Sequence, residues 1–239
     1  MLNRTKFKLP TAISFLVCEL VLGILVQTTQ GKVNMVVSYA CVVLACLFML
    51  LFFERNISYY LTQAGLICTV MADLFLMVLS PIKQLPAMIF FSVTQICYFL
   101  RLYLNEESSK KRKAHLIVRI SAVLFAIVIT IAVLREKTDP LSLVSLFYYA
   151  NLIVNIIVAF TQLKSQTLLA IGLLLFLLCD TLIGLDVMAS SYIPVSEGSF
   201  IHWLLNVDLN LAWIFYVPSQ ALIGISLLKL KAMSQRMTD

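Results

Sequence analysis

Eight long apolar runs, separated by short polar segments, dominate this sequence. An α-helix needs about 20 predominantly apolar residues to cross the hydrocarbon core of a bilayer. The runs therefore predict an all-α bundle of eight transmembrane helices, near residues 10–27, 33–53, 59–80, 85–104, 114–134, 141–161, 166–187 and 207–228. The 239 residues are 61% hydrophobic and 13% charged, which excludes a water-soluble globule. We expect one integral membrane domain over residues 1–239.

Basic residues are divided unequally between the two ends of the predicted helices. Fourteen of the 18 fall on the side of the N-terminus, and the other four are Lys32, Lys83, Arg135 and Lys137. Segments rich in Lys and Arg stay in the cytoplasm. We therefore expect a multi-pass protein of a bacterial plasma membrane with both termini in the cytoplasm. This topology explains the net charge of +6, so we expect no nucleic-acid partner.

The polar loop at residues 105–113 divides the chain into two groups of four predicted helices. In the third helix Gly65 precedes Asp73 by eight residues, and in the seventh Gly172 precedes Asp180 by eight. Both helices would run in the same direction across the membrane, as a parallel internal repeat requires. The spacing is consistent with two parallel four-helix halves.

Charged side chains inside three of the predicted helices need a specific reason. A carboxyl in mid-helix costs on the order of 2.5–3.5 kcal/mol in a bilayer. Glu19, Asp73 and Asp180 are the clear cases. Asp73 and Asp180 each lie about 21 Å from the start of their predicted helix at 1.5 Å per residue, so they can face one another. We interpret them as the centre of a functional site.

Uncharged polar side chains fall at similar depth on other predicted helices. Within each helix they are spaced three or four residues apart, so each pair projects from one face. They are Gln95 with Tyr98, Asn151 with Asn155, and Tyr216 with Gln220. We predict that they line a cavity around the aspartates. The alternative for the asparagines and for Gln220 is a hydrogen bond that only holds two helices together.

Short motifs at these positions resemble those of the YhhN-like lysoplasmalogenase family of integral membrane proteins. They are Ala72-Asp73 in GLICTVMADLFLM, Cys179-Asp180 in IGLLLFLLCDTLIGL, Tyr216 and Gln220 in WIFYVPSQALIG, and Gln95 and Tyr98 in FSVTQICYFL. Their order and placement match over roughly residues 10–228. The sequence departs from the family pattern where Ala72 replaces glycine, Cys179 replaces serine and Gln95 replaces histidine. A lysine–proline pair expected near the second helix is absent.

The resemblance implies hydrolysis of the vinyl ether bond of lysoplasmalogens, which releases a fatty aldehyde. This reaction starts with protonation of carbon and passes through an oxocarbenium ion, so it needs an acid and a nearby negative charge. Two carboxyl groups in a low dielectric resist ionising together, and can therefore supply both. We expect Asp73 and Asp180 to be catalytic, with substrate or water positioned by Gln95, Tyr98, Tyr216, Gln220, Asn151, Asn155 and Glu19.

Two other functions fit the same residues. Two parallel halves with polar groups near mid-membrane also describe a transporter or a lipid-binding protein. A family member that has lost activity is the third possibility, because Gln95 cannot shuttle a proton as histidine does. The expected partners are the bilayer and a membrane lipid, and we expect no metal ion and no cofactor.

Overall fold

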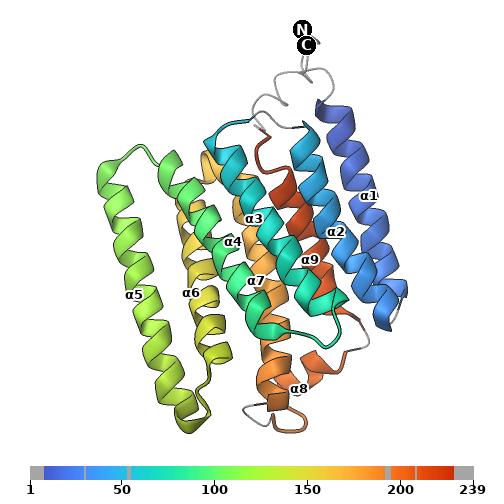
Figure 1. The fold of residues 1–239 in the computed structure, drawn as a ribbon, viewed down its shortest axis with the longest axis vertical. Coiled ribbons are helices and arrows are strands. Elements are labelled where there is room, and N and C mark those ends of the chain that lie inside the picture. Colours follow the sequence, from blue (N-terminus) through green and yellow to red (C-terminus); the bar gives the residue numbers. More distant parts are fainter. Residues whose placement is uncertain (1–7, 30, 53–54, 192–194, 208, 229–239) are drawn as a thin grey trace.

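The computed structural model describes residues 8–29, 31–52, 55–191, 195–207 and 209–228, which contain helices and no strand. In chain order these are α1 (Lys8–Thr28), α2 (Gly31–Phe52), α3 (Ile57–Asp73), the π-helical turn η1 (Leu74–Val78), α4 (Gln84–Asn105), α5 (Ser109–Leu134), the 3₁₀ turn η2 (Arg135–Lys137), α6 (Pro140–Thr161), α7 (Leu163–Ser191), α8 (Phe200–Leu205) and α9 (Leu211–Gly224). The long helices run side by side as an all-α polytopic bundle (Figure 1).

Seven of the described helices are long and apolar enough to cross a membrane. They are α1, α2, α3 with η1, α4, α5 with η2, α6 and α7. The predicted eighth span, 207–228, corresponds to α9, which has only 14 residues. Helical geometry begins after Asn210 and gives way to turns from Ile225 onward, so the count of eight is not confirmed. α9 instead packs inside the bundle against α1, α2 and α7.

Local signals explain where several helices begin. The side chain of Asn56 accepts a hydrogen bond from the backbone N–H of Tyr59 at 2.8 Å, which caps α3. Asp139 and Ser142 form a reciprocal capping box at the start of α6, with Pro140 in the first turn. Such caps satisfy backbone groups that a helix end leaves unpaired.

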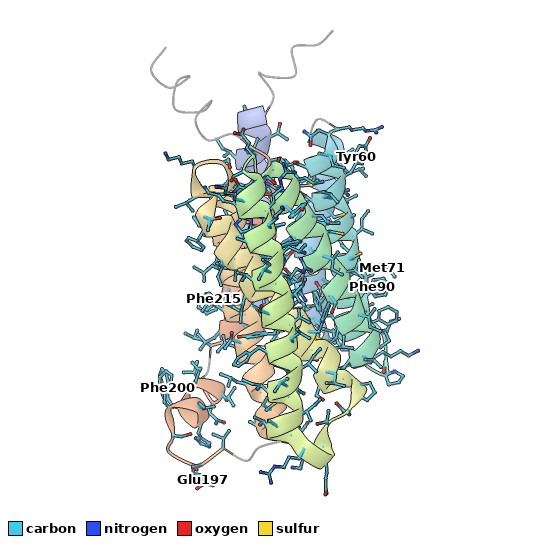
Figure 2. The ribbon with its side chains drawn as sticks, turned by 90° about the vertical axis from the view of Figure 1, so that its left-hand side faces the viewer. Tyr60, Met71, Phe90, Glu197, Phe200 and Phe215 are labelled. Carbon is cyan, nitrogen blue, oxygen red and sulfur yellow. The ribbon has the colours of Figure 1, made fainter. Side chains whose placement is uncertain are left out.

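The packing of the helices repeats between the two halves of the chain. In the first half α1 packs on α2, α2 on α3 and α3 on α4, and in the second α5 packs on α6, α6 on α7 and α7 on α9. Across the halves, α4 packs on α6 and α9 packs on α2. The beginning of α1 and the end of α9 lie at the same end of the bundle (Figure 1). Figure 2 shows Tyr60 near this end, where α1 begins, and Glu197 and Phe200 at the opposite end.

Two glycines at matching positions allow the closest helix contacts. A Cβ on Gly65 in α3 would lie 2.3 Å from the Cε1 atom of Tyr98 in α4. A Cβ on Gly172 in α7 would lie 2.9 Å from Cγ1 of Ile223 and 3.2 Å from the carbonyl oxygen of Ser219, both in α9. Each half therefore uses a glycine eight residues before its aspartate to bring its last two long helices together.

Candidate active site

A cavity of about 410 Å³ lies between η1, α4, α5, α6, α7 and α9, in the half of the bundle away from the beginning of α1. Its lining is mainly apolar, with side chains such as Leu76, Ile129 and Leu146. Asp73 and Asp180 are the only carboxyl groups among the lining residues. An apolar cavity with a few converging polar groups is the usual form of a small-molecule or lipid site.

Asp73 lies at the back of this cavity, at the junction between α3 and the π-helical turn η1. The side chain is fully buried. Its Oδ2 atom accepts a hydrogen bond from the hydroxyl of Tyr216 in α9, and its Oδ1 atom is buried with no hydrogen-bond partner among the described residues. Single π-helical turns inside α-helices are frequent at functional sites.

Asp180 enters the cavity from α7 and remains partly exposed there. Its Oδ2 atom accepts a hydrogen bond from the hydroxyl of Tyr148 in α6. Because both carboxyl groups line the same apolar cavity, their ionisations are coupled. The site thus contains two tyrosine–aspartate pairs that come from four helices.

A row of aromatic rings fixes both tyrosines. The ring of Phe91 lies 5.5 Å from that of Tyr148 and 5.8 Å from that of Phe176, and Phe176 lies 5.9 Å from Tyr216. Trp213 makes an edge contact with Tyr216 at 5.3 Å. Because edge-to-face packing has a preferred geometry, Phe176 and Trp213 hold the hydroxyl of Tyr216 toward Asp73, while the tilted ring of Phe91 packs on Tyr148.

The amide side chains predicted for the cavity lie outside its lining. Asn155 in α6 donates to the carbonyl oxygen and the Oε1 atom of Gln95 in α4, at 2.8 and 2.9 Å. Asn151 donates to the carbonyl of Phe147, and the amide of Gln220 contacts Ser219 at 3.2 Å. All four amide side chains are fully buried.

Each of these four amide side chains also keeps one polar atom that is buried without a partner among the described residues. These atoms are Gln95 Nε2, Asn151 Oδ1, Asn155 Oδ1 and Gln220 Oε1. Unpaired buried polar atoms of this kind are sites for ordered water. The bonds of Asn155 to Gln95 join α6 to α4, which is the alternative that the sequence left open, whereas Asn151 and Gln220 bond within their own helices.

Tyr98 and Glu19 also lie apart from the cavity lining. Tyr98 is fully buried against Gly65, between α3 and α4. Glu19 in α1 is 2% exposed and lies beside the thiol of Cys41 in α2. Of the nine residues predicted for the site, the structure therefore brings three to the cavity, namely Asp73, Asp180 and Tyr216.

Tyr148 is the functional candidate that the sequence reading missed. It lies three residues before Asn151, on the same face of a helix that was already assigned to the polar layer. That spacing was available as a signal, but nothing in the sequence shows that this face meets Asp180 of α7. Trp213, which lines the cavity beside Tyr216, was missed for the same reason.

Comparison with known proteins identifies the family of this chain. No curated protein and no solved structure matches the chain. A model of the YhhN family matches residues 33–227, which include both aspartates, both tyrosines and every helix from α3 to α9. The chain belongs to the YhhN family.

Proposed function

We propose that this protein is a membrane-embedded hydrolase that cleaves the vinyl ether bond of lysoplasmalogens. The resemblance to lysoplasmalogenases and the membership of the YhhN family support this choice. The observation that carries it is the meeting of two carboxyl groups, each hydrogen-bonded to a tyrosine, at one apolar cavity.

The chemistry of the bond matches these groups. A carboxylic acid protonates the carbon of the vinyl ether that is remote from oxygen, and the neighbouring carboxylate stabilises the resulting oxocarbenium ion. Water adds to this ion, and the hemiacetal collapses to an aldehyde and an alcohol. Positioned general acids contribute typically about 10²–10⁴-fold to a rate. Each tyrosine holds one oxygen of its carboxyl group and so fixes the orientation of that group.

The walls of the cavity suit a single-chain lipid. Leu76, Ile129, Val133, Leu146 and Met188 offer apolar contact to an alkenyl chain. The vinyl ether of a lysoplasmalogen lies just below the head group, and the two aspartates lie inside the bundle rather than at its rim. The beginning of α1 and the end of α9 lie at the same end of the bundle (Figure 1), and the excess of Lys and Arg on that side favours the cytoplasm.

The placement of Gln95 favours an active enzyme over a relative that has lost catalysis. Gln95 is fully buried, bonded by Asn155, and absent from the lining of the cavity. The replacement of histidine at this position therefore leaves the two carboxyl groups and their tyrosines in place. A lipid sensor would not require two such pairs facing one cavity.

The test is incubation of the purified protein with a lysoplasmalogen and with its ester analogue. We expect aldehyde from the vinyl ether and no fatty acid from the ester. Asp73→Asn and Asp180→Asn should both lower aldehyde release, while Asp186→Asn, which changes an exposed carboxyl of α7 outside the cavity lining, should not. Wild-type turnover in both cavity variants would exclude this mechanism.

A further inference from the structure

We infer that the two carboxyl groups have different roles: Asp180 touches the substrate and donates the proton to its carbon, whereas Asp73 acts only through Asp180. Asp180 is then the catalytic residue, and Asp73 is a positioning residue. This assignment rests on the proposed function and deepens it. Two observations carry it: the exposure of the two side chains and the packing of the helices around them.

Exposure separates the two groups most clearly. The side chain of Asp180 is partly accessible, and it lines the cavity. The side chain of Asp73 is 0% exposed, and even its oxygen without a hydrogen bond is buried. Both residues line the cavity, but the side chain of Asp180 offers accessible surface to a ligand atom and that of Asp73 offers none, so a ligand reaches Asp180 more readily.

The helix packing explains why only one carboxyl group is accessible. In the first half α1 packs against both α2 and α9, and η1 packs against α2, which closes the protein around Asp73. Tyr39 and Cys41 of α2 lie near enough to Asp73 to be affected by its charge. In the part of the chain that the structure describes, the second half has no corresponding packing that covers Asp180, although an exact repeat would provide it.

The difference lies in α5, which corresponds to α1 in the repeat. Among the described helices, α5 packs closely against α6 but makes very few close approaches to α4, although α4 precedes it in the chain. Figure 2 shows α5 crossing the front of the bundle. Ile129 and Val133 of α5 and Met88 of α4 line the cavity on this side, and Asp180 faces it. The helices thus cover the side chain of Asp73 in the first half and leave that of Asp180 accessible in the second half.

The assignment gives a balanced reaction. The O–H bond of Asp180 breaks as a C–H bond forms with the electrons of the C=C bond, which leaves an oxocarbenium ion and the Asp180 carboxylate. Water adds to the ion and returns a proton to Asp180. The hemiacetal then loses its C–O bond, and its hydroxyl proton ends on the departing glycerol oxygen. One water is consumed, and Asp180 is restored.

Asp73 contributes to this sequence without contact. Two carboxyl groups that line one apolar cavity resist ionising together, so a negative charge on Asp73 opposes the ionisation of Asp180. The negative charge on Asp73 also stabilises the positive oxocarbenium ion. Tyr216 donates to Asp73 and Tyr148 donates to Asp180, so each carboxyl group is oriented by its own tyrosine.

Chemical labelling tests the accessibility directly. Dicyclohexylcarbodiimide, an apolar reagent for carboxylic acids in membranes, is added to the purified full-length protein, and the modified peptides are followed by mass spectrometry. We expect Asp180 to be modified at least about tenfold faster than Asp73. Glu19, which is buried outside the cavity lining, serves as an internal reference and should react slowly. Modification of Asp73 at the same rate as Asp180, or faster, would overturn the assignment.

Kinetics test the roles. Asp180→Asn should abolish detectable aldehyde release, and Asp180→Glu should restore part of it, because a longer carboxyl still reaches the open cavity. Asp73→Asn should lower kcat by about tenfold to a hundredfold with KM unchanged. Equal loss in the two Asn variants, or a greater loss in Asp73→Asn, would contradict the inference when both variants melt at the wild-type temperature.

The two proposals fail in different ways. If the wild-type protein releases no aldehyde, the proposed function is wrong and proton donation by Asp180 is wrong with it. If the wild type releases aldehyde but Asp73 is labelled first, or Asp73→Asn is the inactive variant, the function stands and only the assignment of the two carboxyl groups is wrong.

Discussion

At the scale of single residues, the site depends on hydroxyl groups that hold carboxylates. Tyr148 and Tyr216 each donate to one aspartate, and their rings are locked by Phe91, Phe176 and Trp213. Removing a hydroxyl from such a pair leaves the ring packing in place but takes a donor from a buried carboxylate. The effect therefore falls on the orientation of the acid rather than on the fold.

We predict that Tyr148→Phe lowers kcat by about tenfold, since its hydroxyl stabilises the carboxylate that forms on Asp180 as the proton leaves, and a hydrogen bond to a charged group is worth about 1.5–3 kcal/mol. Tyr216→Phe should have a smaller effect, because it orients the carboxyl group that does not touch the substrate. Tyr149→Phe is the matched control: this tyrosine also lines the cavity but bonds Thr181 and no carboxylate. Aldehyde release measures all three, and a larger loss in the control than in Tyr148→Phe would contradict the prediction.

Arg101 is a second residue whose placement only the structure reveals. It is 1% exposed in α4 and donates to Thr62 Oγ1 at 2.8 Å, Gln166 Oε1 at 2.9 Å and Ser226 Oγ at 2.6 Å. It also donates to the carbonyl oxygen of Ser226 at 3.0 Å. One side chain thus ties α3, α4 and α7 to the segment after α9, far from the cavity.

Arg101→Gln should lower the free energy of unfolding by about 1–3 kcal/mol, because the buried acceptors lose their donor. Arg112→Gln is the control, since Arg112 lies over the ring of Tyr103 at 6.0 Å, near the surface end of α5. Unfolding of the detergent-solubilised protein by SDS titration gives the comparison. Equal stability of the two variants would show that the buried network does not hold these helices together.

At the scale of helices, the sequence located most boundaries within a few residues. The predicted runs at 85–104 and 141–161 correspond to α4 (Gln84–Asn105) and α6 (Pro140–Thr161). The π-helical turn after Asp73 was not predicted, because the apolar run continues through it without any change in composition. The shortening of the last span to α9 was missed for the same reason.

The contact between α3 and α4 gives a prediction about stability. Gly65→Ala should lower the free energy of unfolding by about 1–3 kcal/mol, because its new Cβ meets the fixed ring of Tyr98 and overpacked cores cost about that much. Gly172→Ala should cost less, since the atom nearest to its new Cβ, Cγ1 of Ile223, lies at 2.9 Å and has less far to move than the ring of Tyr98. Gly184→Ala, where a Cβ meets nothing within 4 Å, is the control. Thermal melting in detergent ranks the three, and a different order would refute the role of Gly65.

At the scale of the whole molecule, two similar halves form one functional cavity because they are not covered equally. α1 of the first half packs on α9 of the second half, whereas α5 of the second half packs on α6 and leaves space beside α4 of the first half. The volume of that space then limits which lipid chain fits. This property belongs to the assembled bundle and not to any one helix.

Gly184 offers a way to fill the cavity without disturbing its walls, because it lines the space and has open room for a side chain. Gly184→Phe should lower kcat/KM for a long-chain lysoplasmalogen by about tenfold more than for a short-chain one, as steric discrimination in apolar pockets reaches this size. Equal losses for both chain lengths would mean that the chain binds elsewhere.

Hydropathy and residue spacing alone determined that this chain is an all-α membrane protein and where most of its helices run, and they selected Asp73 and Asp180 as site candidates, because these properties depend on neighbouring residues and on the cost of charge in a bilayer. Tertiary structure decided that Tyr148 bonds Asp180, that Gln95, Asn155 and Glu19 lie outside the cavity lining, and that only one of the two cavity aspartates has an accessible side chain. These facts depend on which faces of distant helices meet, and a helix face carries no local mark of its partner.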